Sequence, residues 1–361
     1  MLTSGQAQSP LAMIRNNSPI RTLAFSANGE YLVSGDEEGI GVWEVESGRR
    51  TTRMAVQTDN CLAVSKDGNW ISAGTEWGLV YVWNARTYQL IFSHQEDSDI
   101  NGVDFSPTDS ESSRLLVASR NCTATIWDAV TQQRTVGPLH HETAVRAAKY
   151  SPQGDRIATA TRNSVWVYNS DDGHLLADIP VEVTPWYHTT LLWSSQRLFV
   201  VSNQQIKKID ASTGSVVSEW PVFDTNYSSC IALPQHREFI AYSTNSTITF
   251  WDTSTHTQLG VIKSTHKIRS IAFSPDSRCL AVGESNGEIT FKQLSSIIVS
   301  ITNCNVCHWI SGTNLLFIAF LRSLQSLCLI YTPLSGNQIF ILAILLLVCG
   351  RTINSPMRRH H

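Results

Sequence analysis

The stretch "LAFSANGEYLVSGDEEGIGVWE", residues 23–44, decides the fold of this chain. Apolar and polar side chains alternate at its start, a turn rich in Ser, Asn and Gly follows, and a second alternating segment begins at Tyr31. Alternation with a period of two predicts β-strands, and two such strands around a Gly-containing turn predict a β-hairpin. After "GDEEG" a third alternating segment reaches Trp43. The stretch therefore predicts three antiparallel strands in one small sheet.

The same unit recurs along the chain. Further hairpins begin at residues 62, 103, 148, 191, 231 and 271, and each is followed by a third strand. The equivalent positions near the ends of the third strands are Trp43, Trp83, Trp127, Tyr168, Ile209, Trp251 and Lys292. Their spacing stays between 40 and 44 residues. One sheet of this size cannot bury both of its faces, so seven such units are expected to stack around an axis.

Seven units at this period, each with a terminal Trp-Asp or a relic of one, resemble the WD-repeat family of β-propellers. The resemblance covers about residues 10–294 and implies an all-β fold, a seven-bladed β-propeller in which a fourth, outer strand completes each blade. The seventh unit ends at Leu294 without such a strand. Because residues 9–26 align with an outer strand, a loop and an inner strand, residues 10–15 are predicted to close the ring as an N-terminal strand.

The blades depart from the family pattern at positions that help to lock each blade. Where the family often has Asp, six residues before the terminal Trp, the sequence has Asn121, Asn245 and Asn286. The fourth and fifth blades lack the terminal Trp. In the third blade the resemblance implies a near-complete hydrogen-bonded set of His94, Ser119, Asn121 and Trp127. We therefore expect a normal architecture with looser local locking.

Charge and cysteine usage restrict the class of protein. Residues 1–294 carry 23 basic and 30 acidic side chains. A mildly acidic surface argues against nucleic-acid binding, which normally needs a basic face. The N-terminus lacks the pattern of a secretory signal, and single cysteines are scattered through the repeats. These features predict a cytoplasmic protein with reduced thiols, with the nucleus as the alternative location.

The tail, residues 295–361, differs from the repeats. It contains four arginines and no Asp or Glu, and its apolar runs lie at 315–321 and 339–349. Neither run reaches the roughly 20 apolar residues of a spanning helix. A membrane segment within residues 315–349, a disordered tail, and translated non-coding sequence are the three alternatives. The domain prediction is a propeller over residues 10–294 followed by an apolar non-propeller tail.

The sequence contains no recognisable catalytic constellation. The glycines of "GDEEG" and "GESNGE" lie in turns between strands, with no helix N-terminus after them to hold a phosphate. "CNVCH", residues 304–308, matches the spacing for haem attachment and half of a zinc site, but it lacks the structural context and the further ligands. We therefore predict no enzymatic activity, no cofactor and no bound metal.

Candidate binding residues come from the repeat register. Three blades place an arginine at one equivalent position, the start of the innermost strand, namely Arg21, Arg146 and Arg269. Three aromatic residues lie in turns or loops predicted on the same rim, namely Trp77, Trp186 and Tyr187. Arginine and large aromatic side chains commonly anchor interfaces. The alternatives are that the arginines pair with local acids such as Glu142 or Asp36, and that the aromatic rings cover a blade.

These observations predict a monomeric, non-catalytic scaffold that presents propeller loops to a protein or peptide. The arginines favour a partner with an acidic or phosphorylated segment, because guanidinium pairs bidentately with carboxylate and phosphate. The first alternative is an adaptor tethered to a membrane by the tail. Others are an unrecognised enzyme and a substrate receptor of a cullin-RING ubiquitin ligase, since "VWNAR", residues 82–86, resembles an adaptor-docking motif with Asn84 in place of an acid.

Overall fold

The structure is a computed structural model, and it describes residues 13–56, 61–107, 113–181, 191–202, 205–222, 230–234 and 238–294. It also describes the strand backbone of residues 316–322, 325–333 and 339–345. The chain divides into two compact units, residues 1–297 and 298–361, which are described separately below.

The first unit contains seven four-stranded antiparallel sheets, which we number as blades in chain order. Blade 1 contains β2 (Thr22–Phe25), β3 (Tyr31–Asp36), β4 (Gly39–Glu44) and β5 (Arg50–Met54). Blade 2 contains β6 (Cys61–Val64), β7 (Trp70–Gly74), β8 (Leu79–Asn84) and β9 (Leu90–Gln95). Blade 3 contains β10 (Ile100–Phe105), β11 (Arg114–Ser119), β12 (Thr123–Asp128) and β13 (Arg134–His140).

The later blades repeat this order of strands. Blade 4 contains β14 (Ala147–Tyr150), β15 (Arg156–Ala160), β16 (Ser164–Asn169) and β17 (Leu175–Pro180). Blade 5 contains β18 (Leu191–Ser194), β19 (Arg197–Ser202), β20 (Gln205–Asp210) and β21 (Val216–Pro221). Blade 6 contains β22 (Cys230–Ala232), β23 (Phe239–Thr244), β24 (Thr247–Asp252) and β25 (Gln258–Lys263). Blade 7 contains β26 (Ile268–Phe273), β27 (Cys279–Glu284) and β28 (Glu288–Gln293), with β1 (Ile14–Arg15) as its fourth strand.

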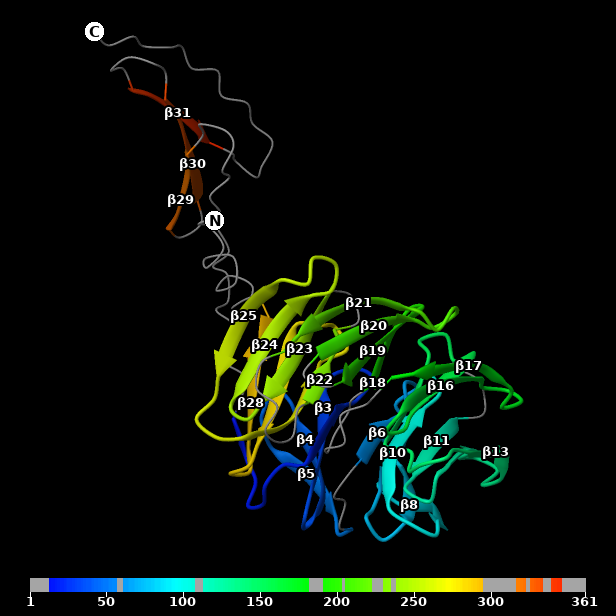
Figure 1. Cartoon of the computed structure of the whole chain (residues 1–361). Helices are drawn as coiled ribbons and strands as arrows, with labels where there is room; N and C mark the ends of the chain where they lie inside the picture. The colour runs from blue at the N-terminus through cyan, green and yellow to red at the C-terminus, as the bar shows by residue number, and fades with distance from the viewer. Residues whose placement is uncertain are drawn as a thin grey trace. The chain divides into compact units, whose positions relative to one another are not determined.

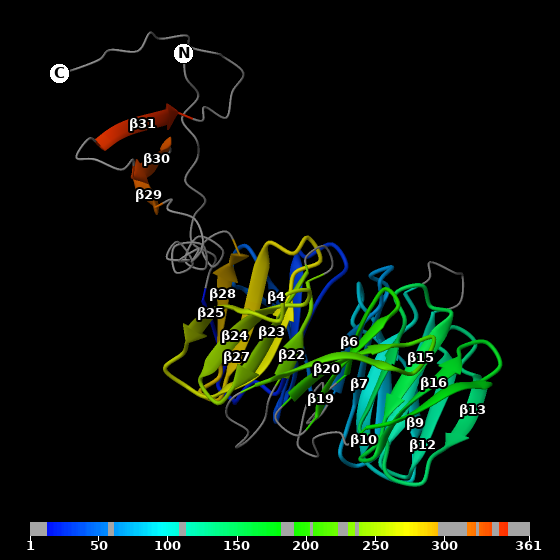
Figure 2. The ribbon, with the colours of Figure 1, turned by 45° about the horizontal axis from the view of Figure 1, so that its top comes forward.

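The blades form a closed ring. The first strand of each blade contacts the first strand of the next, and β26 of blade 7 contacts β2 of blade 1. Figure 1 shows the colour passing from blue through cyan and green to yellow around this ring. Figure 2 shows the strands of blade 6 in the order β22 to β25 from the inside of the ring outward. The predicted all-β, seven-bladed propeller is confirmed.

The ring is closed by a strand from the N-terminus, as predicted. β1 pairs antiparallel with β28, with Ile14 opposite Ile289 and Arg15 opposite Glu288. The backbone N–H of Asn16 continues the ladder with a 2.9 Å hydrogen bond to the carbonyl of Gly287. Of the predicted strand 10–15, residues 10–12 lie outside the described residues. Sequence segments from both ends of the propeller therefore share one blade.

The core lies between blades. Side chains of successive residues in a strand point to opposite faces, so each sheet can present an apolar face to both neighbours. Ile14, Ala281 and Ile289 of blade 7 pack with Leu32 and Trp43 of blade 1. All five are buried, and burying each large apolar side chain contributes about 1.5–3 kcal/mol. Stacking between blades, rather than any single blade, thus stabilises the ring.

The last residue of the third strand caps the turn that follows it. The Asp128 carboxylate accepts hydrogen bonds of 2.8 Å from the N–H groups of Val130 and Thr131. Asp210 and Asp252 cap their turns in the same way. Asn84 does so through its side-chain oxygen, which accepts from the N–H groups of Arg86 and Thr87 at 2.9 Å. A local turn therefore accounts for the side chain of Asn84 in "VWNAR".

The hydrogen-bonded set expected in blade 3 does not form. The indole N–H of Trp127 donates to the hydroxyl of Thr125 at 3.0 Å, not to Ser119. The side-chain amide of Asn121 donates to Glu96 at 3.3 Å, and His94 packs against the Trp127 ring with centroids 4.1 Å apart. The prediction is wrong because the expected partners are replaced by two other residues. Thr125 accepts the hydrogen bond of Trp127, and Glu96 accepts that of Asn121.

The second unit contains one three-stranded antiparallel sheet. Its strands are β29 (Leu316–Arg322), β30 (Gln325–Pro333) and β31 (Ile339–Leu345), paired in that order. The two apolar runs of the tail thus contribute β29 and β31. No helix among the described residues has the length and apolar character needed to cross a membrane. The predicted domain boundary at Leu294 and the status of the tail remain predictions.

Candidate interaction face at the channel mouth

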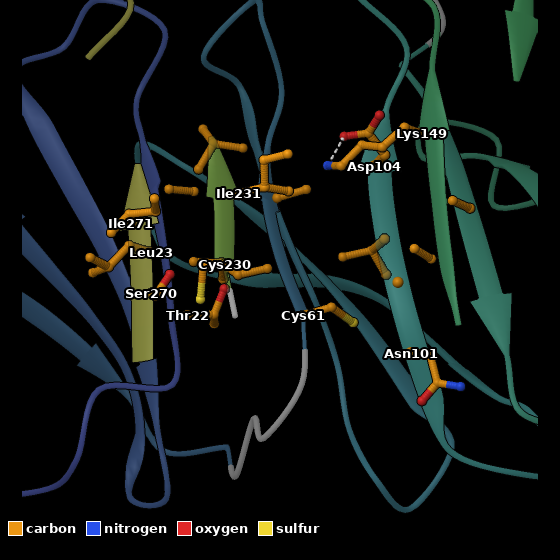
Figure 3. Close-up of a pocket in the computed structure, with 18 of the residues that line it drawn as sticks. Thr22, Leu23, Cys61, Asn101, Asp104, Lys149, Cys230, Ile231, Ser270 and Ile271 are labelled. Atoms are coloured by element: carbon orange, nitrogen blue, oxygen red, sulfur yellow. Dashed lines mark hydrogen bonds and ion pairs between the residues drawn. The ribbon is translucent and has the colours of Figure 1, made fainter. Parts of the chain in front are cut away.

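A cavity of about 260 Å³ lies among the inner strands. Residues of β2, β6, β10, β14, β22 and β26 line it, so it is the central channel of the propeller. Figure 3 shows Asn101 at one end of the channel and the ion pair of Asp104 with Lys149 at the other. The Asp104–Lys149 distance is 2.8 Å. Because inner strands begin at the Asn101 end, the three predicted arginines belong to this mouth.

Two buried thiols line the channel below that mouth. Cys61 donates to the carbonyl of Ile100 at 3.6 Å, and Cys230 donates to the carbonyl of Arg269 at 2.9 Å. Burial raises the pKa of each thiol to about 12. Because the thiolate is the nucleophilic form, both sulfurs are unreactive at neutral pH. These cysteines act as small apolar side chains of the channel wall.

Backbone irregularities aim two residues at this mouth. The β10–β11 ladder shifts register between Ile100 and Gly102, and the β26–β27 ladder shifts between Ile268 and Ser270. A bulge leaves its extra residue unpaired and re-aims the side chain. The residues at the two shifts are Asn101 and Arg269, which occupy equivalent positions at the starts of their inner strands. Asn101 uses its side-chain amide to hold the carbonyl of Val145 at 2.8 Å.

Arg21 is engaged by an acid of its own blade. Its guanidinium lies 2.5 Å from the carboxylate of Glu37, and about a third of the Arg21 side chain is exposed. The acid is not Asp36, which was considered from the sequence. Asp36 is fully buried and pairs with Arg53 of β5 at 2.6 Å. Glu37 lies in the β3–β4 turn, directly after the strand that pairs with β2, so proximity in the hairpin explains the pairing.

Arg146 lies in a cluster of positive charge. Its pKa is lowered, first because burial desolvates the guanidinium and then because Arg162 and Arg120 lie nearby. Arg162 is exposed in the β15–β16 turn, and Arg120 pairs with Asp99 at 3.0 Å. Sequence reasoning missed both neighbours. The signal was present, because the turns after β11 and β15 both read "RN" at equivalent positions.

Arg269, at the blade 7 side of the mouth, lies near a second cation, Lys267. Burial and the charge of Arg269 both lower the pKa of Lys267. The buried Nε of Arg269 has no hydrogen-bond partner within the part of the chain that the structure describes. Because β26 contacts β2, Arg269 and Arg21 belong to neighbouring blades. The mouth thus carries arginines from blades 1, 4 and 7.

Trp77 is the exposed aromatic residue of this rim. It lies in the β7–β8 turn with 65% of its surface exposed. The side-chain amide of Gln95 holds the carbonyl of Trp77 at 2.8 Å, and the N–H of Ile100 bonds to the carbonyl of Thr75 at 2.9 Å. These bonds join the turn to the loop that enters β10, so Trp77 shares the rim with the starts of the inner strands. Trp186 and Tyr187 lie outside the described residues.

The chain was compared with known protein families and proteins. The family model described as "WD domain, G-beta repeat" matches residues 8–44, 55–84, 86–128 and 257–291. Blades 4 and 5, which lack the terminal Trp, lie outside these matches.

Three relatives show the range of similarity. The periodic tryptophan protein 2 homolog of Dictyostelium discoideum is 23% identical over 73% of this chain and 32% of its own length. The apoptotic protease-activating factor 1 of Rattus norvegicus is 26% identical over 63% of this chain and 19% of its own length. Actin-interacting protein 1 of Drosophila melanogaster is 23% identical over 75% of this chain and 47% of its own length. The chain spans less than half the length of each.

A solved structure titled "Structure of U3-55K" is similar in fold. It matches with a TM-score of 0.64 and 16% identity, over 76% of this chain and 91% of that one. At this identity the likeness concerns the fold alone. It agrees with the seven-bladed ring built above from the strand order and the contacts between inner strands.

Proposed function

Because the chain belongs to the WD-repeat family of β-propellers, we propose that it is a non-catalytic scaffold whose channel-mouth face binds an acidic or phosphorylated segment of a protein partner. The observation that carries the proposal is the gathering of Arg120, Arg146 and Arg162 beside the channel mouth. Like charges held near one another destabilise a free surface, and an anionic ligand relieves that repulsion.

The face offers two kinds of anchor. Arg21 and Arg269 add charge from blades 1 and 7, and Trp77 adds an exposed ring from blade 2. Arginine and tryptophan are the residue types that most often dominate binding energy at interfaces. Arg21 can exchange its surface ion pair with Glu37 for a partner's carboxylate or phosphate at low cost, because exposed ion pairs contribute only about 0–1 kcal/mol. A monomeric ring would leave this whole rim accessible.

The proposal is tested with arrays of acidic and phosphorylated peptides probed by the full chain. The strongest peptide is then titrated by fluorescence anisotropy against the wild type, Arg146→Ala with Arg162→Ala, and Arg21→Ala with Arg269→Ala. We expect each double variant to bind at least about tenfold more weakly, since charge-assisted bonds contribute about 1.5–3 kcal/mol each. Affinity should also fall steeply with salt.

The matched control is Arg134→Ala, which removes an exposed arginine from the outer strand β13. It should bind like the wild type. Equal affinity of all variants, each with an unchanged melting temperature, would contradict the use of this face. A cytoplasmic or nuclear location remains a prediction, which subcellular fractionation of the native protein would test.

A further inference from the structure

Blade 7 brings together three side chains that commonly bind metal ions. His266 lies in the loop before β26, Glu284 ends β27 and Glu288 begins β28. One ligand atom from each lies within 4.8 Å of the other two. Between His266 and Glu284 the distance from Nδ1 to the carboxylate oxygen Oε2 is 3.4 Å. A β-turn joins the two strands, so the two glutamates start from neighbouring backbone positions.

Glu284 is buried without a permanent positive partner. Only 4% of its surface is exposed, and within the described part of the chain its carboxylate contacts only Ser264 and His266. The Ser264 hydroxyl donates to Oε1 at 2.5 Å, which is a neutral contact. His266 is a cation only when it is protonated. Burying a carboxylate without a cation beside it is costly, so this site favours an added positive charge.

Three polar groups surround Nδ1 of His266. The Asn286 side-chain oxygen accepts the N–H of Glu288 at 3.0 Å, which directs the amide nitrogen toward His266. That nitrogen lies 3.1 Å from Nδ1 and can only donate. The Thr265 hydroxyl lies 3.0 Å from Nδ1, and Oε2 of Glu284 lies 3.4 Å from it. A metal ion bound to Nδ1 would displace the Asn286 and Thr265 contacts and would place a positive charge beside the buried Glu284 carboxylate.

The distance of 3.4 Å between His266 and Glu284 suits two ligands of a tetrahedral ion. Nitrogen and oxygen ligands bind Zn²⁺ at about 2.0–2.2 Å, which places two tetrahedral ligand atoms about 3.4 Å apart. We propose that His266, Glu284 and Glu288 form a binding site for a divalent transition-metal ion, with zinc the best fit, at the blade that closes the ring. Water would complete the coordination. A ligand set of imidazole and carboxylates suits zinc better than magnesium or calcium, which prefer oxygen ligands alone.

The site lies next to the closure strand. Glu288 is opposite Arg15 in the β1–β28 ladder, and its carboxylate lies 3.4 Å from the Arg15 guanidinium. The backbone carbonyl of Glu284 also accepts the N–H of Ile20 at 3.1 Å. A metal ion here would link the loop before β26 to both strands that contact the N-terminal segment. Metal binding is therefore expected to stabilise the closed ring.

The test uses the full chain after dialysis against EDTA. The wild type, His266→Asn and Glu288→Gln are each titrated with ZnCl₂, MgCl₂ and CaCl₂. For each salt the heat of binding and the melting temperature are measured. The matched control is His140→Asn, which removes an exposed histidine from another blade. At a zinc concentration about 100-fold above its dissociation constant, the wild type should melt about 5 °C higher.

The quantity compared between the proteins is the rise in melting temperature caused by zinc. The melting temperatures themselves are not compared, because Glu288→Gln also removes the ion pair with Arg15. We expect both site variants to lose the zinc-induced rise in melting temperature and to bind zinc at least about tenfold more weakly. His140→Asn should behave like the wild type. Zinc bound by the tail cysteines and histidines would give the same heat in all four proteins and no site-dependent increment. An equal increment in all four proteins, or none in the wild type, would overturn the proposal.

Discussion

Blades 3 and 4 are neighbours with the same strand order, but different side chains hold them together. In blade 3 the indole of Trp127 bonds to Thr125, and His94 packs on its ring. In blade 4 Tyr168 replaces the tryptophan, and its hydroxyl lies 3.2 Å from Nε2 of His141.

The two positions nevertheless have the same register. Trp127 is opposite Leu115, and Tyr168 is opposite Ile157. The family model matches blade 3 and not blade 4. The sheet therefore depends on strand alternation and on stacking between blades, whereas the locking side chains can change. The hydrogen-bonded lock of blade 4 is thus more deeply buried than that of blade 3, and this difference can be measured.

The largest expected effect is the loss of the Tyr168 ring. Tyr168 is 4% exposed and packs in the cluster between blades 3 and 4, so Tyr168→Ala should destabilise the protein by about 3–5 kcal/mol. Trp127 is partly exposed, so Trp127→Ala should cost less despite removing a larger ring. Thermal unfolding measures both. Tyr168→Phe keeps the ring and should cost only about 1 kcal/mol. A greater loss for Trp127→Ala would contradict the idea that the blade 4 lock is the more buried one.

The second expected effect is a difference in the stability lost when His141 or His94 is replaced. In His141, Nδ1 donates to the carbonyl of Leu139 at 3.0 Å, and Nε2 accepts from Thr159 at 2.8 Å. His141→Ala leaves buried hydroxyls on Thr159 and Tyr168 without this partner, so it should cost about 2–3 kcal/mol. His94 is about a third exposed, so its contact with Glu96 at 3.5 Å is partly solvated, although Glu96 itself is mostly buried. His94→Ala should therefore cost about 1 kcal/mol or less. Equal melting temperatures of the two variants would show that burial does not distinguish them.

Much of the fold could be predicted from the sequence. The repeat of alternating strands placed all seven blades, and the alignment of residues 9–26 with an outer strand and the loop after it predicted closure by β1. Both inferences depend on backbone pairing and apolar periodicity, which are local and repeated. The blade 3 lock was predicted wrongly because it depends on which of several polar side chains reaches Trp127. Thr125 lies two residues away on the same face of its strand and reaches the indole first.

The candidate site could be predicted only in part. The repeat register placed Arg21, Arg146 and Arg269 at the starts of inner strands, but it could not show their partners. Glu37, Arg120 and Arg162 come from turns, where a shift of one residue changes which charge faces the mouth. The cluster of His266, Glu284 and Glu288 was missed for a related reason. Its members come from a loop and two strand ends, and their spacing matches no ligand motif.

The smallest expected effect is a dependence of stability on pH that comes from His141, at the blade 4 lock. Burial lowers the pKa of His141 below its ordinary value, and the nearby His140 lowers it further, against opposing hydrogen bonds with Leu139 and Cys122. The unfolded chain therefore takes up a proton on His141 at a higher pH than the folded protein does. Above the ordinary histidine pKa of about 6.5 both states are neutral and the full stability is present. As the pH falls below that value, the unfolded state is favoured, until the folded state is protonated as well. The melting temperature of the wild type should consequently fall more between pH 7.5 and 5.5 than that of His141→Gln. Parallel pH profiles for the wild type and His141→Gln would show that the blade 4 histidine is not held neutral by its burial.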